Sequence, residues 1–217
     1  MHVMNGGMRM SPPLRIILLT LVTLGASATG AAAQACLGLP SRDGQIALAA
    51  AYGIGDDFDT LGGDFHADVT GPASLGFSYA RDVGDAEALP AGSDGDVNIY
   101  AARAAYELYL LEPSICGVAG IWFRDSGVER LGVPLGIGFG KTLRGERVST
   151  TVYALPQYVW LREDPNVAGV DATTSNEFMG EAGVTLGLLP FYVSGGVVVS
   201  TIEGEDARFL IRAGLLF

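Results

Sequence analysis

The sequence alternates apolar residues with small or polar residues, at a period of two, in segment after segment from about residue 44 to the C-terminus. Successive side chains of an extended strand point to opposite faces, so each segment has one apolar face. The last segment ends on an aromatic residue and places five apolar side chains on one face: Phe209, Ile211, Ala213, Leu215 and Phe217. Such segments in series, separated by glycine- and aspartate-rich stretches, predict an all-β fold.

We expect about ten strands, with eight as the alternative if the second and third merge or pair irregularly. The expected strands lie at residues 45–54, 64–69, 73–81, 97–110, 116–124, 130–140, 148–161, 176–188, 191–202 and 208–217. The seventh strand is ambiguous in phase, because Gln157 favours odd-numbered residues inside, whereas Tyr153 and Leu155 favour them outside. Pro156 cannot donate to a ladder, so we expect a bulge or a local break there.

The composition favours a membrane-spanning barrel. A hydrophobic fraction of 49% with 31 glycines is unusual for an acidic soluble protein, and no stretch after residue 33 is apolar for long enough to form a membrane-spanning helix. Strands cross a membrane only as a closed barrel, because an open sheet leaves backbone groups unpaired in lipid. We therefore expect a closed antiparallel up-and-down transmembrane β-barrel over residues 44–217.

The pattern of connections agrees with this fold. An even number of strands puts both ends of the chain on the periplasmic side, and the short turns near residues 71, 113, 145 and 189 all fall on that side. The fold-level alternative is a secreted soluble barrel of the lipocalin type, with its apolar residues inside. A small sealed lumen cannot hold so many Leu, Val and Phe side chains, which argues against that alternative.

The N-terminus predicts a cleaved signal peptide at residues 1–33. Arg9 and Arg15 give a positive region, residues 16–24 are apolar, and Ala33 ends a small-residue cleavage site. The apolar run is too short for the alternative of a transmembrane anchor, which needs roughly 20 residues.

Residues 34–43 are expected to form an N-terminal periplasmic segment. A lipoprotein anchored at Cys36 is a further alternative, but the sequence lacks the Leu usually found three residues before a lipidated cysteine.

The charge is strongly acidic. The whole chain has a net charge of −11, and removal of the signal peptide, which holds two of the 13 basic residues and no acid, leaves about −13. Nucleic acid is excluded as a partner, because its binding needs basic patches. The acids concentrate in four expected outer loops: Asp56, Asp57, Asp59, Asp82, Asp85, Glu87, Asp94, Asp96, Glu163, Asp164, Asp171, Glu203, Glu205 and Asp206.

Charged and polar residues also fall on the expected inner faces of the strands. This predicted lumen network comprises Asp64, His66, Asp68, Arg103, Glu107, Glu177, Glu181 and Arg212. Side chains fill the interior of a barrel this small, and unpaired buried charges are costly, so we expect ion pairs that plug the lumen. A narrow cation-preferring channel is the alternative.

His66 is the one histidine after the signal peptide, and it lies between Asp64 and Asp68 on one strand face. A barrel hydrolase using Asp64 and His66 is therefore a third hypothesis. The alternative without catalysis, in which an inward histidine forms hydrogen bonds with its carboxylate neighbours, fits the sequence better. We expect no enzyme, no cofactor and no metal site, because the sequence has no nucleophile elbow, P-loop or zinc cluster.

Two cysteines remain, Cys36 and Cys116. On the predicted topology, both lie at the periplasmic end of the barrel, in an oxidising compartment. We expect a disulfide between them that staples the N-terminal segment across the lower mouth.

Taken together, the signal peptide, the alternating segments and Phe217 resemble the small porin-like and OmpA/OmpX-type barrels of the bacterial outer membrane. The resemblance implies a location in that membrane, where the barrel meets lipid and lipopolysaccharide. It also implies that Phe217 and the apolar face of the last strand are the signal read by the barrel-assembly machinery. We expect a monomer with a structural or interaction role at the cell surface.

Overall fold

The computed structural model describes residues 33–40, 46–55, 59–70, 72–83, 97–109, 113–125, 128–165, 171–202 and 207–217. Within these residues the chain forms the short helix α2 (Ala33–Cys36) and ten strands. The strands are β1 (Ile46–Ile54), β2 (Asp59–Thr70), β3 (Ala73–Val83), β4 (Val97–Tyr109), β5 (Ser114–Asp125), β6 (Glu129–Arg144), β7 (Ser149–Asp164), β8 (Thr173–Leu188), β9 (Phe191–Ser200) and β10 (Arg208–Leu216).

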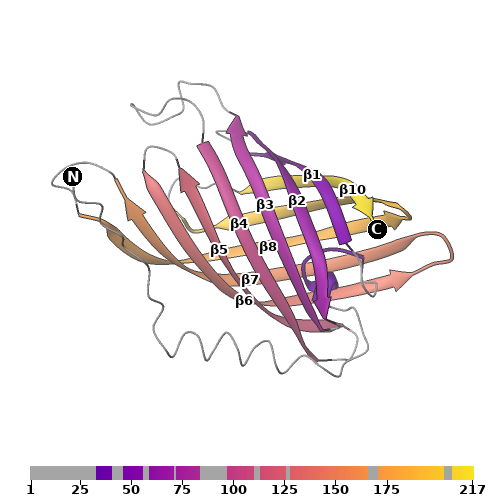
Figure 1. Cartoon of the computed structure of the whole chain (residues 1–217). Coiled ribbons are helices and arrows are strands. Elements are labelled where there is room, and N and C mark those ends of the chain that lie inside the picture. Colours follow the sequence, from indigo (N-terminus) through magenta and orange to yellow (C-terminus); the bar gives the residue numbers. More distant parts are fainter. Residues whose placement is uncertain are drawn as a thin grey trace, which may run out of the picture.

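The strands form one closed barrel in which each strand is antiparallel to its neighbours in the chain (Figure 1). β1 closes the barrel against β10, with a register that runs from Ala47↔Leu216 to Ile54↔Phe209. Two backbone hydrogen bonds between Ile46 and Phe217 extend this pairing to the C-terminus. The predicted fold class is confirmed, with ten strands rather than eight.

The outer surface of the barrel is apolar. Exposed side chains alternate along every strand, and they include Leu48, Phe77, Tyr100, Leu135, Tyr158, Phe178, Val193 and Phe209. Most residues that alternate with them are small, polar or charged, and many are buried, although β7 also turns large apolar side chains inward. This distribution is the reverse of a lipocalin-type barrel and is what a lipid-facing exterior requires. No helix among the described residues is long and apolar enough to cross a membrane.

The structure corrects the bounds of two strands and decides the phase of a third. β2 begins at Asp59 instead of residue 64, and β3 extends to Val83, so Asp59 and Asp82 belong to strands and not to loops. In β7 the odd-numbered residues face inward: Tyr153, Leu155, Gln157, Val159 and Leu161 are all buried. This resolves the phase that Gln157 and Tyr153 left open.

Pro156 interrupts one ladder without a bulge. β7 pairs with β8 in unbroken register through Pro156↔Gly180. β6 and β7 keep the same register on both sides of Pro156. However, the ladder between them has a gap from the pair Gly136↔Gln157 to the pair Phe139↔Ala154. The interruption follows from the missing N–H of proline.

The N-terminal residues lie inside the barrel. All eight residues from Ala33 to Pro40, here called the plug, are buried. Helix α2 contacts β3 to β7 at the end of the barrel where the C-terminus lies (Figure 1). The connections at this end span two to four residues, whereas those at the opposite, outer end span three to 13. Residues 1–32 of the predicted signal peptide (1–33) lie outside the described residues, and its last residue, Ala33, is the first residue of α2.

Candidate functional site

The centre of the lumen holds a cluster of ion pairs around Arg212. Its Nε donates to Asp64 Oδ2 over 2.9 Å, and its Nη1 donates to Glu181 Oε1 over 2.9 Å. The Tyr153 hydroxyl also donates to Glu181 Oε1, at 2.9 Å, and Arg103 Nη1 reaches Glu181 Oε2 at 3.2 Å. Two arginines thus balance two carboxylates, in a set of residues drawn from β2, β4, β7, β8 and β10.

The register explains how Arg212 reaches Asp64 across an intervening strand. β1 lies between β10 and β2, with Arg212 opposite Ala51 and Asp64 opposite Ala49. Because both positions are alanine, no bulky side chain projects from the inner surface of β1 there, and the Arg212 side chain can cross this strand. A larger residue at Ala49 or Ala51 would occupy this path.

His66 also faces the lumen and is buried, and its ring lies over Gly76, its partner on β3. A Cβ on Gly76 would come within 2.6 Å of His66 Nδ1, so the close approach needs glycine. Within the described part of the chain, His66 Nδ1 has no hydrogen-bond partner, while Asp64 is bound by Arg212.

The other predicted lumen residues are spread along the barrel. Asp68 and Glu107 lie toward the plug end, where Glu107 is opposite Cys116. Glu177 lies toward the outer end, where its Oε2 accepts a hydrogen bond from Thr201 Oγ1 at 2.8 Å. The central cluster therefore contains four of the eight predicted residues: Asp64, Arg103, Glu181 and Arg212.

A second cluster lies nearer the outer end and was missed from the sequence. Asp82 Oδ2 accepts a hydrogen bond from Arg124 Nη2 at 2.9 Å, and Asp82 Oδ1 accepts one from Thr60 Oγ1 at 2.8 Å and lies 4.0 Å from Arg208 Nη1. The prediction that Asp82 is a loop acid is wrong, because Asp82 is a buried, inward residue of β3. Asp82 follows the same alternation as Ser74, Gly76 and Ser78, which were expected to face inward, and this alternation could have predicted an inward Asp82.

Other loop predictions have mixed outcomes. Glu163 and Asp164 end β7, and Glu163 pairs with Arg130 at 2.7 Å. Tyr52 donates a hydrogen bond to Asp59. The remaining acids, apart from Asp171, lie outside the described residues: Asp56, Asp57, Asp85, Glu87, Asp94, Asp96, Glu203, Glu205 and Asp206.

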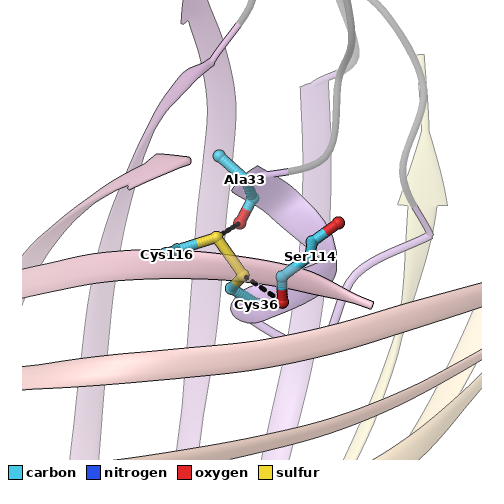
Figure 2. Close-up of a disulfide and its surroundings, with 4 residues drawn as sticks. All are labelled: Ala33, Cys36, Ser114 and Cys116. Atoms are coloured by element: carbon cyan, nitrogen blue, oxygen red, sulfur yellow. Dashed lines mark hydrogen bonds between the residues drawn. A yellow bond between two sulfur atoms is a disulfide. The ribbon is translucent and has the colours of Figure 1, made fainter. Parts of the chain in front are cut away.

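The plug is fixed at the opposite end of the lumen. A disulfide joins Cys36 to Cys116 on β5, across a sequence separation of 80 residues, as predicted (Figure 2). The Thr185 hydroxyl of β8 donates to the carbonyl of Gly38 at 2.5 Å. Gly38 adopts a φ of 78°, which favours glycine. The plug is thus tied to β5 and β8.

Strand β6 makes room for the plug with glycine. A Cβ on Gly140 would lie 2.3 Å from the carbonyl carbon of Ala35, and one on Gly138 would lie 2.8 Å from the Cβ of Cys36. Gly138 and Gly140 therefore allow the backbone of β6 to pack closely against α2. Among the residues with a described position, no group of three or more His, Cys, Asp or Glu residues is placed to hold a metal ion.

No known protein family matches the sequence, and no curated protein matches it. Among solved structures, the N-terminal β-barrel domain of OprF from Pseudomonas aeruginosa is similar to this chain, with a TM-score of 0.38 and 13% identity, over 80% of this chain and 98% of that one. Ail, the attachment invasion locus protein of Yersinia pestis, crystallised with the heparin analogue sucrose octasulfate, is similar with a TM-score of 0.31 and 14% identity, over 80% of this chain and 95% of Ail. The assignment of a membrane-type barrel rests on the strand pairing and the apolar exterior.

Proposed function

We propose that this chain is a bacterial outer-membrane barrel with a structural or interaction role at the cell surface, and that its lumen is closed. The observation that carries the proposal is the occupation of the lumen at three levels: the plug, the central cluster and the outer cluster. Arg208 and Arg212 belong to the two clusters and lie four residues apart on β10, about 13 Å along the strand. Each level narrows a different section of the same passage.

The energetics favour a lumen that stays closed. Removing one partner of a buried ion pair costs about 3–5 kcal/mol, because the other charge remains buried without compensation. Separating Arg212 from Asp64 and Glu181 would incur a penalty of this kind. The plug cannot leave the lumen while the Cys36–Cys116 disulfide is intact.

The proposed location and partners follow from the exterior. The apolar outer surface suits lipid, and the acidic outer loops would meet lipopolysaccharide through divalent ions. Phe217 is 70% exposed at the end of the closing strand, where the barrel-assembly machinery would reach it. We propose that the chain is exported by its signal peptide and remains a monomer.

We do not propose an enzyme. A hydrolase would need Asp64 to orient His66, but the Asp64 carboxylate is engaged by Arg212. The His66→Ala variant and the unaltered chain should therefore show the same hydrolysis of lipid or peptide substrates.

Liposome swelling tests the closed lumen. Liposomes that contain the full refolded chain should swell in isosmotic arabinose at the rate of protein-free liposomes, whereas a general porin should give rapid swelling. Heat-modifiable migration on a gel verifies that the chain is folded. Swelling by the folded chain above the protein-free rate would overturn the proposal in favour of an open pore, and cell fractionation that places the protein outside the outer membrane would overturn the location.

A further inference from the structure

The outer half of the lumen contains a cavity of about 220 Å³ between the two ionic clusters. Residues of β1 to β5 line one side of it, and residues of β8, β9 and β10 line the other. A cavity of this volume has room for several water molecules or for a small organic molecule. The ion pairs described above close the lumen beneath this cavity, so a ligand would bind there without passing through.

Among the residues that the structure describes, the charged side chains that line the cavity are all basic: Arg103, Arg124 and Arg208. This is unexpected in a chain that carries 24 acidic and 13 basic residues. The side chains of Arg103 and Arg208 are 23% and 17% exposed, so each retains surface that a ligand can contact after forming its ion pair.

The rest of the wall is largely apolar. It includes Ile99, Trp122, Val198 and Leu210, with hydroxyl groups from Thr60 and Ser200. Trp122 lies inside the barrel because its partner on β6 is Gly132, where a Cβ would come within 2.1 Å of the indole ring. The site therefore combines guanidinium groups with an aromatic surface and aliphatic side chains.

We propose that this cavity is a binding site for a small amphipathic anion, and that a monocyclic aromatic carboxylate is the class of ligand that fits it. Guanidinium groups match the planar geometry of a carboxylate and form charge-assisted hydrogen bonds with it. An aromatic ring packs against Trp122 and the aliphatic wall. A neutral ring loses the first interaction, and a small inorganic anion loses the second.

Calorimetry on the full chain in lipid nanodiscs tests this proposal, with empty nanodiscs as the blank. Benzoate should bind saturably, and benzyl alcohol and benzylamine should bind more weakly by about tenfold or more, because they lack the carboxylate. Chloride at the same ionic strength should not compete. Equal binding of benzoate and benzyl alcohol would overturn the proposal, and so would the absence of a saturable heat with benzoate. Both results come from the unaltered chain and do not depend on the folding of a variant.

Trp122 reports where the ligand binds. The chain has two tryptophans, and the other, Trp160, is 40% exposed on the outer face, so Trp160→Phe leaves Trp122 as the sole indole emitter. Benzoate should change its fluorescence over the same concentration range as the calorimetric signal. A saturable heat with no change at Trp122 would place the ligand elsewhere and refute the assignment.

Substitutions identify the residues involved. Arg103→Gln and Arg208→Gln should each weaken benzoate binding by about tenfold. Arg162→Gln is the matched control, because Arg162 lies on β7 with a side chain that is 52% exposed and does not line the cavity. Gel migration verifies the fold of each variant. Folded Arg103 and Arg208 variants that bind benzoate as well as the Arg162 variant does would contradict the proposal.

Discussion

Replacing both Cys36 and Cys116 with serine removes the covalent link between the plug and β5. The disulfide spans 80 residues. A cross-link that closes a loop of this length lowers the entropy of the unfolded chain by an amount worth about 4.5 kcal/mol at 25 °C. The double variant should still fold, because contacts such as the hydrogen bond from Thr185 to Gly38 remain, but its free energy of unfolding should fall by about this amount.

Urea titration of the refolded protein in detergent micelles, followed by tryptophan fluorescence, measures the difference. Adding a reductant to the unaltered chain is the matched control, and it should reproduce the loss while leaving the double variant unchanged. A loss below about 1 kcal/mol would refute the reasoning that the closed loop constrains the unfolded chain.

The remaining predictions concern the lumen, the plug and the closing strand. Arg212→Ala should lower the free energy of unfolding by about 3–5 kcal/mol in the same titration, because two carboxylates lose a buried partner; a loss near zero would contradict the central cluster. Gly140→Ala should cost about 1–3 kcal/mol because its Cβ would collide with Ala35, whereas Gly195→Ala, with nothing within 4 Å, should be nearly neutral. Equal effects of the two glycine variants would contradict the close packing of the plug. Phe217→Ala should reduce the amount of barrel in the outer membrane of cells but leave refolding in detergent unchanged, and normal amounts in cells would contradict its proposed role as an assembly signal.

Much of the fold could be predicted because its outer face is chemically uniform. β10 and β6 alternate so regularly that their direction and phase follow from the sequence. The disulfide could be predicted from topology, because an even number of strands places Cys36 and the start of β5 at one end. Inner faces are harder to predict, since a small lumen accepts a large side chain wherever a facing residue is small.

Tyr153 illustrates this limit. It points inward because Gly183 and Gly196 leave space for its ring: a Cβ on Gly183 would lie 2.9 Å from its Cε1, and one on Gly196 would lie 3.1 Å from its hydroxyl. These three residues lie on different strands, so the space depends on register, which the sequence does not state. Asp82 was missed for a related reason, because an aspartate at the end of a strand resembles the start of a polar loop.

Single-channel recording in planar lipid bilayers tests the closed lumen most directly. The full, disulfide-bonded chain should give a flat baseline at voltages of either sign in potassium chloride. Arg103→Ala and Arg212→Ala should leave the baseline flat in the disulfide-bonded chain, because the plug and the outer cluster still occupy the lumen. Discrete, cation-selective steps from the unaltered chain would contradict the account and indicate a narrow channel, and steps from either folded, disulfide-bonded variant would show that the plug and the outer cluster do not close the lumen.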